Sequence, residues 1–110
     1  MHNVDIKPLT VNQVWQGRRF KTPKYKQYEK DVLTLLPKLE IPEGNLKLTI
    51  IANVSSKLSD VDNVAKPFID ILQKKYGFDD RRIYELQMRK HLVQKGKEKI
   101  SFSFDRSSFI

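Results

Sequence analysis

The chain has 110 residues, of which 39% are hydrophobic and 31% are charged, and its formal net charge is +8 at pH 7. This composition predicts one folded domain over residues 1–110 rather than a disordered chain. Because there is no cysteine, disulfides, thiolate catalysis and cysteine-ligated metal centres are excluded, and His2 and His91 are too far apart in sequence to suggest a histidine site. Any metal would need oxygen ligands, which favours Mg²⁺ or Mn²⁺.

The excess of positive charge favours a polyanionic partner. Nucleic acid is the first candidate, and an anionic membrane surface is a distant one. No apolar run approaches the roughly 20 residues that a membrane span needs, and the start "MHNVDIKPLT" lacks the hydrophobic core of a signal peptide. We therefore expect a cytoplasmic protein with no membrane partner.

The first half of the chain predicts a short strand at residues 4–6, a helix and a second strand. Thr22-Pro23 has the pattern of an N-cap followed by proline, and apolar residues recur at helical spacing until Pro37. Tyr25 and Tyr28 belong to this apolar face, which favours the core over base stacking. The segment "NLKLTIIANV" alternates as a half-buried strand does. Basic residues before and on the helix predict DNA contacts, at Arg18, Arg19, Lys21 and Lys24. The alternative is that they form a solvated helix face.

The second half predicts another helix, from about Asp62 to Lys75, followed by two strands. Pro67 predicts a loose first turn because an interior proline removes a hydrogen bond, and Gly77 is a suitable terminator. Alternating residues near 84–88 and 100–104, separated by "QKGK", predict a β-hairpin. The expected fold class is α+β in the order β-α-β-α-β-β, with a small mixed or antiparallel sheet and two main helices.

Five of the thirteen acidic residues lie between Asp60 and Asp80, and two of them belong to the stretch "SDVDNVAK". Asp60 and Asp62, at positions i and i+2, can converge on one cation, and Lys66 lies one helical turn beyond Asp62. Carboxylates without histidine on a basic protein suit metal-assisted phosphodiester hydrolysis, in which a lysine offsets charge on the phosphate.

The same residues also have purely structural interpretations. Asp60 or Asp62 could cap the helix, with Asn63 as a competitor for that role, and Asp79-Asp80 could form an ordinary turn. Lys66 and Asp70 could form a solvent-exposed i,i+4 pair. Spacing alone favours these structural roles.

A resemblance adds weight to the catalytic alternative. The pattern "DVDNVAKPFIDIL…KYGFDD" resembles the signature of the RusA family of Holliday junction resolvases, the crossover junction endodeoxyribonucleases. The N-terminal "PLTVNQVWQGRRFKTPKYKQYEKDV", which contains Asn12, is similar to the family as well. The resemblance implies a RusA-like fold and an endonuclease of DNA recombination and repair. That enzyme would use Mg²⁺ or Mn²⁺, cut four-way junctions by paired nicks and act as a homodimer, with either a bacterial or a phage origin.

Carried over to matching positions, the family pattern implies metal ligands at Asp60, Asp62 and Asp80, a catalytic Lys66, and an Asn63 that we group with the DNA contacts. The interval to the second acidic pair is one residue shorter than in a known family member, so Asp79 stays an alternative to Asp80. "SKLS" replaces an arginine run before Asp60. The alternatives are a nuclease of the same fold acting on forks or flaps, and a non-catalytic DNA-binding protein.

One geometrical difficulty follows from this ligand set. The second helix would be roughly 20 Å long, whereas five extended residues after it reach only about 17 Å. Either the helix ends early and the chain doubles back, or Asp80 comes from the other subunit. We favour a site at or near the dimer interface.

Overall fold

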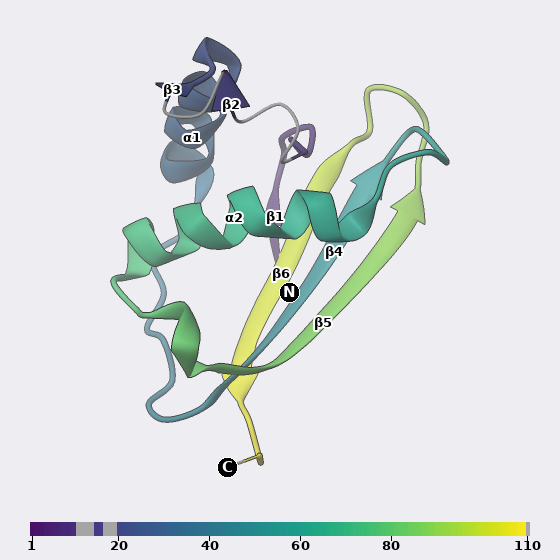
Figure 1. The fold of residues 1–110 in the computed structure, drawn as a ribbon. Helices are drawn as coiled ribbons and strands as arrows, with labels where there is room; N and C mark the ends of the chain where they lie inside the picture. Colours follow the sequence, from purple (N-terminus) through teal and green to yellow (C-terminus); the bar gives the residue numbers. More distant parts are fainter. Residues whose placement is uncertain (11–14, 17–19, 110) are drawn as a thin grey trace.

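The computed structural model describes residues 1–10, 15–16 and 20–109. A four-stranded mixed sheet has the order β1-β6-β4-β5, where β1 is His2–Val4, β4 Leu46–Val54, β5 Ile83–Leu92 and β6 Lys99–Arg106. The helices are α1 (Pro23–Leu35) and α2 (Val61–Tyr76), and a 3₁₀ turn, η2 (Asp80–Arg82), precedes β5. Figure 1 shows α2 crossing the sheet, with α1 above α2 in this view. The expected α+β class and element order are confirmed.

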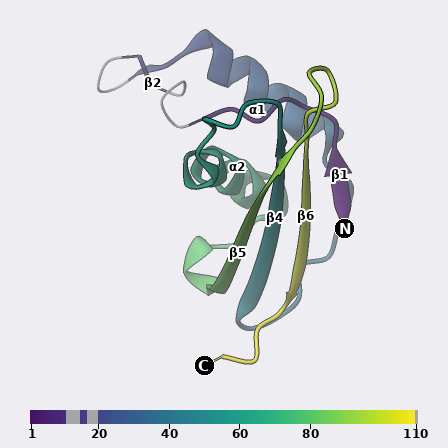
Figure 2. The ribbon, with the colours of Figure 1, turned by 90° about the vertical axis from the view of Figure 1, so that its right-hand side faces the viewer.

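The core lies between one face of the sheet and the two helices (Figure 2). Alternate residues of β4, beginning with Leu46, Leu48 and Ile50, are fully buried, as the strand pattern predicts. Phe68 of α2 packs edge-on against Phe102 of β6, with ring centroids 5.6 Å apart. Such burial of large apolar side chains is the main stabilising term of a small fold, and it fixes α2 across the middle of the sheet.

The first helix begins and ends where the sequence predicts. Thr22 caps it by accepting a hydrogen bond from the Tyr25 backbone N–H at 3.1 Å, and Pro23 occupies the first turn. Tyr25 and Tyr28 are 2% and 5% exposed, so their assignment to the core is confirmed. A short antiparallel ribbon of β2 (Trp15–Gln16) and β3 (Phe20–Lys21), which the sequence did not predict, precedes the helix.

The predicted β-hairpin is wrong. The two C-terminal strands flank β4: β5 pairs with it in parallel and β6 pairs with it antiparallel. The link between them passes the end of β4, where the Val93 N–H donates to the Val54 carbonyl at 2.8 Å. Since β4 is the most thoroughly buried strand, it takes a central position in the sheet, and alternation alone could not show which neighbour each later strand would choose.

The second helix is continuous from Val61 to Tyr76, so the loose first turn expected at residues 63–66 is also wrong. Pro67 lies inside the helix and is buried, as are Val64 and Phe68, and this apolar contact holds the first turns on the sheet despite the missing N–H. Gly77 ends the helix as predicted, with φ 69° and its N–H bonded to the Gln73 carbonyl at 2.8 Å.

The first strand occupies residues 2–4 rather than 4–6, because the chain turns at Ile6, whose N–H donates to the Val4 carbonyl at 2.8 Å. Within the described ranges, no helix has the length and apolar character that crossing a membrane requires.

Candidate active site

Asp60 and Asp62 lie at the start of α2, and both side chains are exposed. Asp60 is the N-cap residue, with extended φ and ψ of −93° and 123°, but its carboxylate makes no capping hydrogen bond to the helix. Its contact is a 3.4 Å bond from the Asn63 amide. The structural interpretation is therefore right about the position of Asp60 and wrong about the capping bond. Both carboxylates face solvent at the positive end of the helix dipole.

Lys66 lies one turn beyond Asp62 on the exposed side of α2. Its ammonium is 3.6 Å from the Asp70 carboxylate, and the two side chains are 65% and 42% exposed. This is the i,i+4 pair that the structural interpretation anticipated. An exposed pair at this distance is weak, about 0.3–0.5 kcal/mol, so Lys66 can exchange Asp70 for a phosphate oxygen at little cost.

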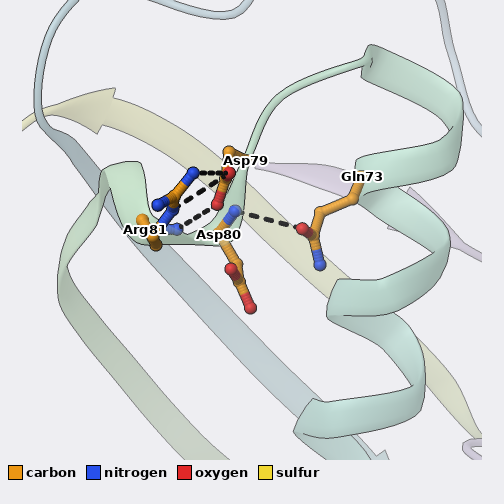
Figure 3. Close-up of polar contacts among 4 residues, drawn as sticks. All are labelled: Gln73, Asp79, Asp80 and Arg81. Atoms are coloured by element: carbon orange, nitrogen blue, oxygen red, sulfur yellow. Dashed lines mark hydrogen bonds and ion pairs between the residues drawn. The ribbon is translucent and has the colours of Figure 1, made fainter.

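The second acidic pair lies at the corner between α2 and β5 (Figure 3). Asp79 accepts from the Arg81 backbone N–H at 2.9 Å and from the Arg81 guanidinium at 2.8 and 3.1 Å. The hydrogen bonds from the Arg81 side chain, followed by that from its backbone, lower the pKa of Asp79 to about 2. Asp79 is thus committed to capping η2, which agrees with its interpretation as a turn residue.

Asp80 is held differently from its neighbour. Its backbone N–H donates to the Gln73 side-chain oxygen at 3.0 Å, while its carboxylate extends away from Arg81 (Figure 3). Among the ion pairs of the described residues, none involves the Asp80 carboxylate. Gln73, which the predicted site did not include, therefore anchors the backbone and leaves the Asp80 carboxylate exposed.

The three predicted metal ligands do not meet within one chain. Asp60 and Asp62 lie before and in the first turn of α2, which spans about 24 Å at 1.5 Å per residue, and Asp80 lies beyond its other end. The helix continues to Tyr76, so the alternative in which it ends early is excluded. After Gly77 the chain turns back, but it brings Asp80 only as far as Gln73 in the last turns of α2. Over residues 1–10, 15–16 and 20–109, no cluster of three histidine or acidic side chains could hold a metal ion.

The predicted DNA contacts fall in different environments. Arg18 and Arg19 lie outside the described residues, as does Asn12, and Lys24 is exposed on α1. The Lys21 ammonium stands 4.5 Å from the centroid of the Tyr25 ring, a cation–π contact. Lys21 is half-buried, and this contact holds its side chain against the first turn of α1.

A polar network connects this basic segment to α2. The Tyr25 hydroxyl donates to Glu29 at 3.0 Å, and the Lys74 ammonium donates to both Glu29 oxygens at 3.0 Å. Burial first, and then the bond to Glu29, raises the pKa of Tyr25. Burial also opposes ionisation of Glu29, but hydrogen bonds from Lys74 and Tyr25 outweigh it and lower the Glu29 pKa. The network fixes α1 against α2.

Lys90 is a further residue near the first acidic pair, and the predicted site did not include it. It lies on β5, on the sheet face shared with Ala52 and α2. Its ammonium donates to the backbone carbonyls of Lys57 and Ser59 at 2.8 and 3.0 Å. No sequence signal distinguishes it from the other lysines of that region.

Exposed carboxylates and a lysine on a basic α+β domain are the features of a phosphodiester-cleaving nuclease. The comparison with protein families is specific: the family model described as Endodeoxyribonuclease RusA matches residues 10–101 of the 110. The chain belongs to the RusA endodeoxyribonuclease family, and the resemblance noted in the sequence is confirmed. Membership implies the nuclease activity of a Holliday junction resolvase, which acts on branched DNA. No curated protein matches the chain.

Proposed function

We propose that this protein is a divalent-metal-dependent endonuclease that resolves four-way DNA junctions by paired nicks as a homodimer. The observation that carries the proposal is the start of α2, where Asp60 and Asp62 are exposed without a capping bond or an ion pair among the described residues, and Lys66 lies one turn further on. Family membership supplies the reaction for these groups.

Asp60, Asp62 and Asp80 are the proposed metal ligands, because hard carboxylate oxygens suit Mg²⁺, with Mn²⁺ as an alternative. The bound ion would supply a water of lowered pKa and charge stabilisation at an in-line phosphoryl centre. Lys66, released from Asp70, offsets the charge of a phosphate oxygen. In this proposal Asn63 steadies the Asp60 carboxylate through its 3.4 Å bond and lies where the DNA backbone would pass.

A shared site at a dimer interface accounts for the separation of the ligands. Strand β5 begins beside Leu46 and ends beside Val54, so it runs from the Asp80 corner to the end of the sheet that precedes Asp60. If the β5 edges of two subunits meet antiparallel about a two-fold axis, Asp80 of one subunit approaches Asp60 and Asp62 of the other.

The surface of β5 supports this arrangement. The strand is at the edge of the described sheet, and three of its large apolar side chains are about half exposed, namely Tyr84, Leu86 and Leu92 at 52%, 49% and 47%. Leu86 and Leu92 are in register with the buried Leu48 and Val54 and so lie on the α2 side of the sheet. An unpaired edge that carries apolar residues favours association with another strand. Two sites related by a two-fold axis would match the symmetry of paired cuts.

The positive charge supports DNA binding over an extended surface. Lys24 is exposed on α1, and we assign phosphate contacts to it together with Lys21, Arg18 and Arg19 of the same segment. Such contacts make affinity fall as salt rises, because counterions are released on binding.

A metal titration on a labelled four-way junction, with linear duplex and flap substrates as controls, tests the activity. We expect paired cuts in Mg²⁺ or Mn²⁺ that are lost in Asp62→Asn while junction binding persists, and binding without cleavage in Ca²⁺. Binding without cleavage in any divalent metal would indicate a non-catalytic DNA-binding protein. Preferential nicking of flaps would instead indicate a nuclease of the same fold that acts on forks or flaps.

Mixing variant subunits tests the shared site. Asp62→Asn and Asp80→Asn homodimers should each be inactive, whereas their heterodimer should contain one site that is intact in all three carboxylates and should nick a single strand. A heterodimer formed from Asp60→Asn and Asp62→Asn is the control and should stay inactive, because both of its sites lose a ligand. Heterodimers that are all equally inactive would rule out sharing.

A further inference from the structure

The loop at residues 55–60, which carries the chain from β4 to α2, is held by a side chain from another strand. Lys90 of β5 donates to the Lys57 carbonyl at 2.8 Å and to the Ser59 carbonyl at 3.0 Å. The loop's own hydrogen bonds near this point are short-range, from Leu58 N–H to the Ser56 hydroxyl and from Ser59 N–H to the Ser56 carbonyl at 3.3 Å. Leu58 is 91% exposed and anchors nothing. Among the described residues, the Ser55 hydroxyl ties the start of this loop to Glu98 at 2.9 Å, and Lys90 is the long-range tie to residues 57–59, immediately before Asp60.

This tie acts directly on the backbone of Asp60. The Ser59 carbonyl and the Asp60 N–H belong to one planar peptide unit, so fixing the carbonyl also fixes the direction in which the chain enters Asp60. The carboxylate of Asp60 has no capping bond to α2, and its contact with the helix is the 3.4 Å bond from the Asn63 amide. The direction of the side chain therefore also depends on the loop backbone that leads into Asp60, which Lys90 holds at the Lys57 and Ser59 carbonyls.

The chemistry of the contact also suits a metal site. Lys90 directs its ammonium to neutral carbonyl oxygens, and the ion pairs of the described residues include none between it and an aspartate. It therefore orders the loop without occupying the oxygens of Asp60 or Asp62. Groups that hold metal ligands in position, rather than touching the metal, commonly change metal affinity by about 10- to 100-fold when removed.

We propose that Lys90 is a positioning residue of the nuclease site: by holding the carbonyl groups of Lys57 and Ser59, it sets the direction in which Asp60 presents its carboxylate to a divalent cation. This inference rests on the function proposed above. It assigns to Lys90 a role in metal affinity, and it assigns no direct contact with DNA or with the metal.

The test compares Lys90→Met with Lys90→Arg, and with Lys95→Met as a control that removes the same charge from the neighbouring loop. Mn²⁺ is titrated into the metal-free protein without DNA, and amide hydrogen exchange is measured at residues 57–60. We expect Lys90→Met to weaken Mn²⁺ binding about tenfold and to speed exchange in the loop. Lys90→Arg should recover part of both effects, and Lys95→Met should match wild type.

Several results would overturn the inference. One is a Lys90→Met protein with wild-type Mn²⁺ affinity and loop exchange. A loss of metal-free junction binding with unchanged Mn²⁺ affinity would make Lys90 a DNA contact. Weaker Mn²⁺ binding caused only by subunit dissociation, seen by sedimentation, would make it an interface residue.

The failure of this inference is distinguishable from the failure of the proposed function. Wild-type protein that shows the expected Mn²⁺ and exchange pattern but leaves junctions uncut contradicts the junction activity and upholds the role of Lys90. Wild-type protein that cuts junctions while Lys90→Met binds Mn²⁺ normally contradicts Lys90 alone. Wild-type protein that binds no Mn²⁺ contradicts both.

Discussion

The two acidic regions of this protein hold their carboxylates in opposite ways. At the start of α2, Asp60 and Asp62 are exposed, and the nearest described contact is the 3.4 Å bond from Asn63. At the corner after Gly77, Asp79 accepts three hydrogen bonds from Arg81, and Asp80 is fixed through its backbone N–H instead. Adjacent aspartates can thus have different roles, because the partner of each carboxylate decides whether it is available.

The sharpest test of this comparison is to remove each carboxylate of the corner in turn. Asp80→Asn should reduce junction cleavage about 100-fold or more, the scale expected when one charge-stabilising catalytic group is lost. Asp79→Asn should reduce it only a few-fold, since its carboxylate serves Arg81 and η2. Single-turnover cleavage rates measure both. Equal losses in the two variants would mean that Asp79 is a ligand or that the corner acts as one unit.

The next test concerns the availability of Lys66. Lys66→Met should slow cleavage about tenfold or more, because a charge that offsets the phosphate is removed, whereas Asp70→Asn should leave the rate near wild type. Urea unfolding should show only about 0.3–0.5 kcal/mol of destabilisation for either, as for an exposed helical pair. A large rate loss in Asp70→Asn would show that the ion pair positions Lys66 and does not merely occupy it.

The corner can also be disturbed through its backbone. Gly77 has φ 69°, and a Cβ there would meet no atom within 4 Å, so Gly77→Ala adds conformational strain without a clash. We expect a loss of about 1 kcal/mol in unfolding free energy and a lower cleavage rate from displacement of Asp80. Gly96→Ala, at φ 93° in the loop before β6, is the matched control. It should lose similar stability and keep its cleavage rate.

The smallest expected effect is an acid-dependent one at Asp79. Its pKa is about 2 in the folded protein, below the ordinary 3.8, so its contribution to stability is complete above about pH 4 and is lost as the pH falls toward 2. Because the group is exposed, solvent screening keeps this contribution small. The difference in unfolding free energy between wild type and Asp79→Asn should shrink between pH 4 and pH 2. A constant difference would mean that the Arg81 contact does not stabilise the fold.

Local signals in the sequence located most elements because their causes are local. Thr22-Pro23 starts α1, Gly77 ends α2, and the alternation of β4 marks its buried face. The prediction that β5 and β6 pair with each other was wrong for the opposite reason. Each of them pairs with β4, and that choice depends on how strands far apart in sequence bury β4 at the centre of the sheet. The continuity of α2 through Pro67 similarly depends on apolar contacts with the sheet. The helix propensity of proline, on which the expected loose turn was based, does not take such contacts into account.

For the candidate site, the sequence by itself limited the kind of chemistry. The lack of cysteine and the isolated histidines restricted any metal to oxygen ligands, whereas the spacing of Asp60, Asp62 and Lys66 also allowed structural roles, and the family resemblance was needed to predict a metal and phosphate site. Only the tertiary structure decided that Asp79 is committed to Arg81, that the Asp80 carboxylate is exposed, and that Lys90 holds the loop before Asp60. Residue types fix what a side chain can do, but folding brings distant partners within hydrogen-bonding distance, and those partners decide which side chains stay available.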